Sequence, residues 1–216
     1  MSLVLESLPV LLRAAIITVV LAVVSMLIGL VLGLLAAVGK IVKNRAANWI
    51  AGAYVSLFRG TPLLVQIYLV YYGLPQVGIR LSPLTSGILA LSVNVGSYLS
   101  ESYRAAILSV DRGQIEAAYS IGMTYTQAMR RIIIPQSIRT ALPTFGNSYI
   151  GLLKDTSLVS VITVRELLQT TQLIISRTFQ PLLMYAEVAL IYWVISSAFG
   201  ILQQKLEQRS ARHVRI

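Results

Sequence analysis

The sequence has no cysteine and a single histidine, His213, which lies in a basic tail. Without cysteine there is no disulfide framework, no thiolate metal site and no cysteine nucleophile. One tail histidine provides neither a Ser/His/Asp triad nor a metal centre. A glycine-rich loop ending in Gly-Lys-Ser/Thr is also missing, so we expect no ATP hydrolysis by that route. These absences predict a chain that is no enzyme and has no cofactor or metal of its own, and that works by binding, gating or transport.

Charged residues are scarce as well. Only 12% of the 216 residues are charged and 56% are hydrophobic, whereas a soluble domain carries about a quarter charged residues. The composition therefore predicts an integral membrane protein. The formal net charge is +10, but the cations fall between apolar runs rather than in one patch. That pattern is typical of membrane topology signals and not of nucleic-acid binding.

Five apolar stretches predict transmembrane helices, at about residues 14–39, 49–74, 84–108, 140–161 and 182–202. The first has no charged residue from Ala14 to Gly39, and at about 1.5 Å per residue it is longer than the roughly 30 Å hydrocarbon layer. It lacks a basic start and exceeds a signal-peptide core, so we expect a permanent span. Gly29 and Gly33 within it either let a neighbouring helix come close or are merely tolerated. The predicted fold class is all-α integral membrane, with a single domain over residues 1–216 and no internal repeat.

The basic residues predict the orientation. Eleven lie near span ends on one side: Lys40, Lys43, Arg45, Arg112, Arg130, Arg131, Arg139, Lys205, Arg209, Arg212 and Arg215. Four lie on the other side: Arg13, Arg80, Arg165 and Arg177. By the positive-inside rule the larger set is cytoplasmic, which places the amino terminus outside and the carboxyl terminus inside.

Polar residues within the predicted spans are candidates for function because they are costly in hydrocarbon. In the second span, Arg59 is followed by Gly60-Thr61-Pro62, where a helix should bend or open. Arg59 is then either functional or directed to the cytoplasmic headgroups. In the third span, Glu101 and Arg104 share a helix face and can neutralise each other. Asn94 lies near mid-membrane and needs a hydrogen-bonding partner, which a substrate could provide.

The fourth span is free of charge up to the polar run Lys154-Asp155-Thr156-Ser157. Adjacent residues lie about 100° apart on a helix, so the two opposite charges cannot share one stripe. With the preceding Asn147 and Ser148, they favour a helix that lines a polar interior. The alternative is that both charges are solvated at the outer interface. Residues 164–180 are only moderately apolar and predict an amphipathic external segment.

Residues 110–135 form a block between the third and fourth spans that is too charged for hydrocarbon. Glu116–Ser120 and Thr126–Arg131 use good helix formers, and Gly122 lies between them, where a left-handed cap most easily ends a helix. We expect two short helices with a sharp bend. Ala117 and Ala118 give the first helix a thin face that another protein can approach, and Glu116 can pair with a cation. The block therefore predicts a docking surface.

The spacing of Glu116-Ala117-Ala118, Gly122, Ile132, Ile134 and Pro135 resembles the cytoplasmic signature loop of the membrane subunits of bacterial ATP-binding-cassette importers. Ile134 departs from the leucine usual there. Together with residues 58–63 (Phe-Arg-Gly-Thr-Pro-Leu) and 153–158 (Leu-Lys-Asp-Thr-Ser-Leu), nearly the whole chain resembles the permeases that import polar amino acids. Residues 71–76 (Tyr-Tyr-Gly-Leu-Pro-Gln) and 190–193 (Leu-Ile-Tyr-Trp) look most like the L-cystine branch.

The resemblance implies a type I importer permease of the bacterial inner membrane, with five spans and a cytoplasmic coupling loop. Two such permeases, identical or related, face each other across a central pathway. Each holds a cytosolic ATPase subunit, in which ATP and Mg²⁺ bind. The loop from Glu116 to Gly122, with Met123 and Thr124 leading into the next short helix, would dock in a cleft of the ATPase. An external solute-binding protein would deliver the substrate.

An amino acid brings an ammonium and a carboxylate, so its site needs an acid, hydroxyls or amides in a lining that excludes water. We expect Asp155 to bind the ammonium. Near the carboxylate we expect Thr156, Ser157 and Asn94, with Gln66 and Arg59 as second choices.

Two other classes stay open on the residues alone. An ion-coupled secondary transporter or channel would use Glu101, Asp155 or Glu187 as its ion site and would need no ATPase. A membrane-embedded scaffold would have no transport activity.

Overall fold

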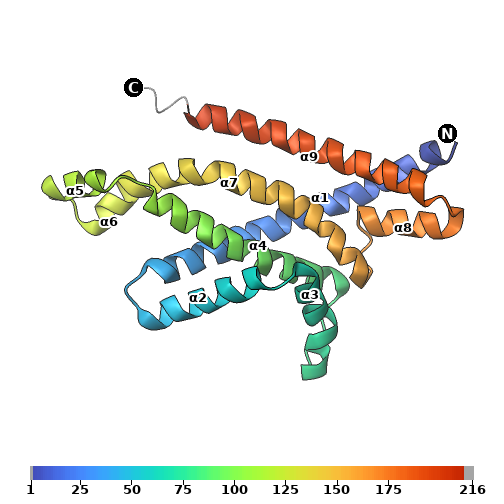
Figure 1. Cartoon of the computed structure of the whole chain (residues 1–216), viewed down its shortest axis with the longest axis horizontal. Coiled ribbons are helices and arrows are strands. Elements are labelled where there is room, and N and C mark those ends of the chain that lie inside the picture. Colours follow the sequence, from blue (N-terminus) through green and yellow to red (C-terminus); the bar gives the residue numbers. More distant parts are fainter. Residues whose placement is uncertain (1, 212–216) are drawn as a thin grey trace.

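The computed structural model describes residues 2–211, and over this range its regular structure is entirely helical (Figure 1). The predicted all-α class is thereby confirmed. The α-helices are α1 (Ser2–Ile41), α2 (Arg45–Gly60), α3 (Leu63–Tyr68), α4 (Pro83–Leu108), α5 (Arg112–Ser120), α6 (Tyr125–Ala128), α7 (Ile134–Asp155), α8 (Leu167–Thr178) and α9 (Pro181–Ala211). Two π-helical stretches, Leu69–Gly73 and Met129–Ile133, and two 3₁₀ stretches, Leu74–Val77 and Thr156–Ile162, extend them. Arg212, His213 and Arg215 of the predicted basic tail lie outside the described residues.

The longest helix, α1, packs along α4, and the glycines of α1 set the distance between the two backbones. A Cβ atom added at Gly33 would lie 2.8 Å from the carbonyl oxygen of Gly96, and one added at Gly29 would lie 2.4 Å from a methyl group of Val95. Both distances are well inside van der Waals contact, so only glycine allows this approach. The first of the two interpretations of Gly29 and Gly33 is therefore confirmed: they let a neighbouring helix come close.

A cluster of charged side chains joins α1 and α4 near their carboxyl-terminal ends. Glu101 of α4 accepts hydrogen bonds from Arg104 Nε and Nη2 at 3.1 and 3.0 Å. It also forms an ion pair with Lys40 of α1. The predicted pair of Glu101 and Arg104 is confirmed, and Lys40 joins it. Glu101 therefore neutralises cations on two helices at once, which ties α1 to α4 at this end.

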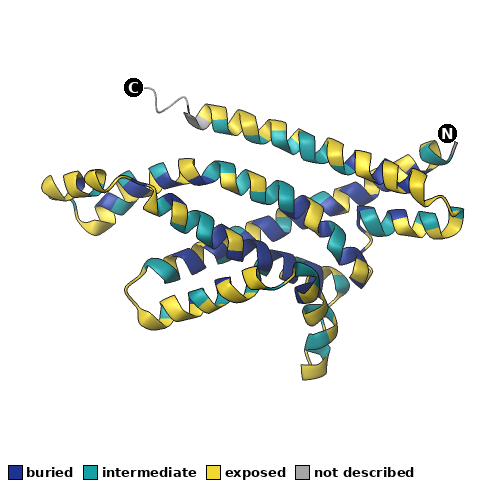
Figure 2. Cartoon of the chain, in the orientation of Figure 1, coloured by how far each residue is buried: buried dark blue, intermediate teal, exposed yellow. Residues whose placement is uncertain are grey.

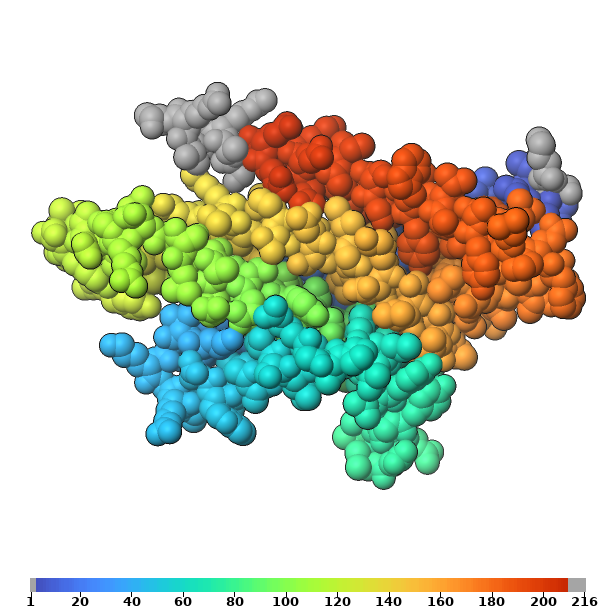
Figure 3. Space-filling view, in the orientation of Figure 1, coloured from blue at the N-terminus to red at the C-terminus, as the bar shows by residue number. Residues whose placement is uncertain are grey.

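The polypeptide bends by 107° between α2 and the segment that begins at Leu63. Thr61 and Pro62 adopt extended backbone conformations here, and the proline has no N–H with which to continue the helix. The bend predicted after Arg59 is confirmed, but it is larger than a kink. Residues 63–77 leave the axis of α2, so the predicted 49–74 span is not one straight helix. Figures 1 and 3 show this segment projecting from the body of the molecule.

The block between α4 and α7 forms the two short helices that the sequence predicts. Gly122 has a φ of 79°, a left-handed conformation that costs glycine little. Its N–H donates to the carbonyl oxygen of Tyr119 at 2.9 Å, and the N–H of Met123 donates to that of Ala118 at 3.0 Å. This Schellman motif ends α5. The second helix differs from the prediction, because α6 continues through the π-helical stretch into α7 rather than standing apart.

The predicted amphipathic external segment forms α8, and its first turn is anchored in the interior. Glu166 is completely buried, and its carboxylate accepts hydrogen bonds from the N–H groups of Leu168 and Gln169 at 2.9 and 2.7 Å. Tyr192 of α9 donates to the same carboxylate at 2.9 Å, and Thr18 of α1 at 3.5 Å. The N-terminal cap of α8 thus joins three helices.

Buried residues are concentrated where α1, α4 and α7 meet, and much of the outer surface of the helices is exposed and apolar (Figure 2). Within the described residues, α1 and α9 are long and apolar enough to cross a membrane. Two bent pairs of segments raise the number of candidate spans to four if each pair is one span. By length and composition α4 is not among them. The apolar surface nevertheless fits a protein whose helices face lipid.

Candidate functional site

A groove of about 340 Å³ lies where the break between α2 and α3 faces α4 and α7. We call it the central groove. Its lining combines apolar side chains with a few polar groups, as small-molecule sites usually do. The lining residues are Thr61, Pro62, Leu63, Asn94, Val95, Tyr98, Ser148, Gly151, Leu152 and Asp155. Because these residues come from three separate parts of the chain, only the folded structure forms the groove.

Asp155, the last residue of α7, supplies the one acidic side chain of this lining. Ser148 lies two turns earlier on the same face of the helix. In contrast, Asn147 points to α9, where Gln203 donates to its side-chain oxygen at 3.3 Å. The expectation that α7 lines a polar interior thus fits Ser148 and Asp155, whereas Asn147 belongs to a contact between helices.

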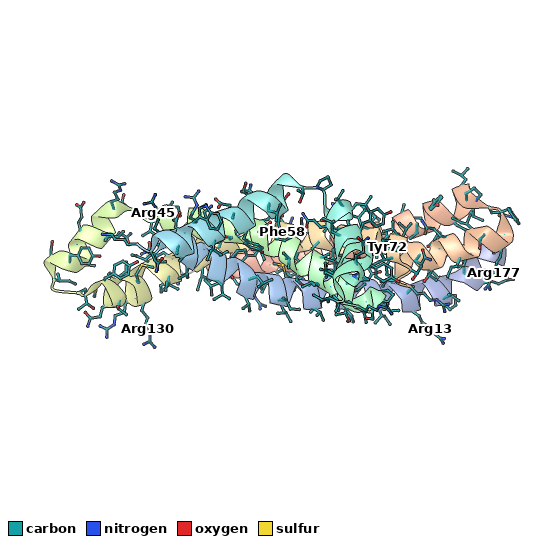
Figure 4. All side chains as sticks on the ribbon, turned by 90° about the horizontal axis from the view of Figure 1, so that it is seen from below. Arg13, Arg45, Phe58, Tyr72, Arg130 and Arg177 are labelled. Atoms are coloured by element: carbon teal, nitrogen blue, oxygen red, sulfur yellow. The ribbon has the colours of Figure 1, made fainter. Side chains whose placement is uncertain are left out.

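Asn94 lines the central groove, is largely buried, and hydrogen-bonds to residues on both sides of the α2–α3 break. Its amide donates to the carbonyl oxygen of Phe58 at 3.2 Å and to Gln66 Oε1 at 3.0 Å. Gln66, which is also buried, donates to the same carbonyl oxygen at 2.9 Å and to that of Thr61 at 3.1 Å. The two amides therefore satisfy carbonyl groups left without helical partners where α2 ends. Figure 4 labels Phe58 in the middle of the molecule, at this break.

Arg59 is exposed and lies beside the groove rather than in its lining. Its guanidinium group stacks over the ring of Tyr98, 5.3 Å from the ring centroid. A cation at this distance from an aromatic face is attracted to the ring. Since Tyr98 lines the groove, Arg59 can influence the groove through Tyr98.

The structure separates Thr156 and Ser157 from this lining. Thr156 is fully buried, and its hydroxyl donates to the carbonyl oxygen of Leu153 at 2.7 Å. Ser157 is half-buried in the 3₁₀ stretch that follows α7. Of the six predicted substrate residues, only Asn94 and Asp155 line the central groove.

Sequence reasoning did not select Thr61, Tyr98 and Gly151, and it named Ser148 only as part of a polar helix face, although all four line the groove. Thr61 stands within the Gly-Thr-Pro stretch that already predicted a bend, so that stretch was a usable signal. The spacing of Asn94 and Tyr98, one helical turn apart, was another. In the part of the chain that the structure describes, no three acidic or histidine side chains gather as a metal centre would require.

A second candidate surface is the loop surface formed by α5 and α6, at one end of the molecule (Figure 1). Glu116, Ala117, Gly122 and Thr124 are exposed there, Met123 is half-buried, and Ala118 is 2% exposed. Only one alanine of the predicted thin face is therefore available to another protein. Thr124 caps α6 through a reciprocal pair of hydrogen bonds with Gln127.

The loop surface also carries large apolar side chains that sequence reasoning did not select. Tyr119, Ile121 and Tyr125 are 47%, 74% and 59% exposed. Exposed apolar groups next to a charged one are typical of a surface that binds another protein. Figure 4 shows Arg45 and Arg130 at this end of the molecule, with Arg13 and Arg177 at the opposite end.

The chain as a whole is similar to known transport proteins. A family model described as "Binding-protein-dependent transport system inner membrane component" matches residues 29–212. The chain is 43% identical to the L-cystine transport system permease protein TcyB of Bacillus subtilis over 198 residues, 91% of this chain and 85% of that protein. It is 42% identical to the probable amino-acid ABC transporter permease protein YckA of the same organism, over 97% of this chain and 92% of that one.

Solved structures agree with the sequence relatives. The chain superimposes on an amino acid ABC transporter crystallised with histidines with a TM-score of 0.91 and 38% identity, over 95% of this chain and 96% of that chain. It superimposes on the MetNI methionine ABC transporter in an inward-facing conformation with a TM-score of 0.80 at 19% identity, covering 95% and 98% of the two chains. The second similarity concerns the fold alone.

Proposed function

The chain belongs to the family of inner membrane components of binding-protein-dependent transport systems, and from this premise we propose that it forms the pathway of an ATP-driven amino-acid importer. Its substrate is L-cystine or another polar amino acid. One observation carries the proposal: the exposed signature loop stands at one end of a helical body that holds a groove with a single acid. The name of the relative TcyB supports the choice of L-cystine.

We place the protein in the inner membrane with five spans, the amino terminus outside and the loop surface in the cytosol. The long apolar helices α1 and α9 and the two bent pairs support four spans. We count α4 as the fifth because it packs along α1 at the level of Gly29 and Gly33. The basic residues at the loop end support this orientation by the positive-inside rule.

In the central groove, Asp155 binds the ammonium of the substrate and Asn94 lies near its carboxylate. Gln66 acts behind Asn94 by holding its amide, while Thr156 and Ser157 support the end of α7 next to Asp155. Arg59, stacked on the ring of Tyr98, places a positive charge at the edge of the groove. A second copy or a related permease faces the groove and completes the pathway, and an external solute-binding protein delivers the substrate.

The energy comes from a cytosolic ATPase in which ATP and Mg²⁺ bind. Glu116, Ala117 and the turn from Gly122 to Thr124 dock in a cleft of that subunit, with Ala118 packing beneath them. Because α6 runs through the π-helical stretch into α7, movement of the docked loop is transmitted to the helix that carries Ser148 and Asp155. This continuity links nucleotide-driven closure of the ATPases to the shape of the groove.

The test is uptake of radiolabelled L-cystine into liposomes that contain the assembled complex, with ATP enclosed. We expect uptake to need ATP, and Glu116→Lys to leave insertion intact but to uncouple ATP hydrolysis from uptake. Glu6→Lys makes the same charge change on an exposed residue at the opposite end and should behave like the unmodified chain. Competition by unlabelled amino acids then identifies the substrate.

Two results would contradict the proposal. Uptake driven by an ion gradient without any ATPase would favour a secondary transporter. Normal uptake by Glu116→Lys would remove the loop surface from the coupling mechanism.

A further inference from the structure

Two neighbouring grooves lie along the first half of α1, on the side of the molecule away from the loop surface: one faces the start of α4 and the other faces α8. One, of about 500 Å³, has an almost entirely apolar lining that includes Ile16, Val20 and Leu21 of α1 and Leu84 and Ile88 of α4. The other, of about 360 Å³, lies between α1 and α8. Both are lined by Ile17 and Arg165, so they adjoin each other and form one surface feature, which we call the outer groove.

Three arginines surround the α8 side of the outer groove: Arg13 of α1, Arg165 before α8, and Arg177 near the end of α8. All three are exposed. Among the described residues none of them takes part in an ion pair. Figure 4 shows Arg13 and Arg177 at the same end of the molecule.

Within the described residues, no carboxylate of this region forms an ion pair with these arginines. Glu166, next to Arg165, is fully buried and binds the first turn of α8 and Tyr192. Glu187 is buried and accepts a hydrogen bond from Ser7 at 2.8 Å. The remaining acid, Glu6, lies seven residues before Arg13, about 10 Å along α1. The three arginines therefore present uncompensated positive charge.

The depth of these charges matches the boundary of a bilayer. Arg13 is the last charged residue before the uncharged stretch from Ala14 to Gly39, so it lies where hydrocarbon gives way to headgroups. The apolar part of the groove reaches Leu21, about 12 Å deeper along α1 at 1.5 Å per residue. A positively charged rim above an apolar channel complements a molecule with an anionic head and a hydrocarbon tail.

We propose that the outer groove binds an anionic phospholipid of the outer leaflet, with its phosphate among Arg13, Arg165 and Arg177 and one acyl chain against Val20, Leu84 and Ile88. Guanidinium groups bind phosphate oxygens through paired charge-assisted hydrogen bonds. The bound lipid fills the space between α1 and α8 and neutralises the arginines. The site requires that α1 crosses the bilayer with its amino end outside, an orientation that rests on the proposed function, but it does not depend on which substrate is transported.

The test is native mass spectrometry of the purified complex titrated with phosphatidylglycerol or phosphatidylcholine of the same acyl chains. We expect a preference for phosphatidylglycerol that falls about tenfold or more when Arg13, Arg165 and Arg177 are all changed to Gln. Arg80→Gln removes the fourth external arginine, which lines neither groove, and should bind as the unmodified chain does. Equal binding by the triple variant and the unmodified chain would overturn the proposal, as would equal binding of the two lipids.

A second pair of variants tests whether the apolar lining of the outer groove binds the acyl chain. Val20→Trp fills the groove and should weaken phosphatidylglycerol binding, whereas Val31→Trp makes the same change at an exposed position of α1 away from the groove and should not. The size-exclusion profile of each variant checks assembly. If the triple variant keeps its lipid but loses the second permease or the solute-binding protein, the arginines belong to a protein interface and the lipid proposal is wrong.

Discussion

Glu166 is a fully buried carboxylate at the junction of α1, α8 and α9. Burying an acid is costly unless hydrogen bonds compensate, and here two backbone N–H groups and the hydroxyl of Tyr192 do so. The residue therefore acts as an N-terminal cap for α8 and as a connection between helices that are far apart in the sequence.

We expect Glu166→Ala to lower the stability of the folded chain by about 3 kcal/mol, because it removes a helix cap and leaves buried donors without acceptors. Tyr192→Phe, which removes one of these hydrogen bonds, should cost only about 1 kcal/mol. Thermal unfolding of the purified chain in detergent measures both. An unfolding temperature for Glu166→Ala equal to that of the unmodified chain would contradict the capping role.

Asp155 is the acidic residue of the central groove. If it binds the ammonium of the substrate, Asp155→Asn should lower the uptake rate roughly tenfold or more, since a hydrogen bond between charged groups contributes about 1.5–3 kcal/mol. Assembly of the complex should be unaffected, because Asp155 is exposed. Lys154→Gln changes the neighbouring exposed charge, which does not line the groove, and should have a much smaller effect. Unchanged uptake by Asp155→Asn would exclude it from the site.

At the scale of elements, the crossing of α1 and α4 depends on glycine. The α1 and α4 backbones are so close that a methyl group at Gly33 would lie 2.8 Å from both the Gly96 carbonyl oxygen and the Leu99 Cβ atom. Neither atom is the end of a flexible side chain, so relief requires moving a helix.

Gly33→Ala should therefore destabilise the chain by about 1–3 kcal/mol through overpacking. Gly52→Ala is the matched control, since no atom lies within 4 Å of a Cβ atom there, and alanine should stabilise α2 by roughly 0.5–1 kcal/mol. Opposite shifts of the thermal unfolding temperature are the expected result. Equal shifts would mean that the crossing adapts to a side chain.

At the break between α2 and α3, two buried amide side chains stabilise the end of a helix. Asn94 and Gln66 together bind the carbonyl groups of Phe58 and Thr61. Without them, the end of α2 would leave acceptors unpaired in the interior, where each costs free energy. The amides thus hold the 107° bend that forms one wall of the central groove.

For the whole molecule, the property to test is its orientation in the membrane, that is, which end faces the cytosol. The chain has no cysteine, so a single introduced cysteine can be labelled without background. Ser176→Cys on α8 and Ser120→Cys on α5 are both exposed and lie at opposite ends of the body. A membrane-impermeant maleimide added to intact cells should label the first, and the second only after permeabilisation. Labelling of Ser120→Cys in intact cells would reverse the proposed topology.

Local features of the chain were predictable because they depend on neighbouring residues. The scarcity of charge predicted a membrane protein, the Gly-Thr-Pro stretch predicted the bend, and Gly122 predicted the left-handed end of α5. The pair Glu101 and Arg104 was also predictable, because a spacing of three places both on one helix face.

The sequence by itself therefore determined the helical membrane class, the position of the bend and the left-handed turn at Gly122, since composition and short-range spacing fix each of these. Only the tertiary structure decided that Asn94 binds the end of α2, that Thr156 is buried while Ser148 lines the groove, and that Glu166 lies inside. Residues dozens of positions apart make these contacts. Burial and partner choice depend on how whole helices pack, and no local pattern records that packing.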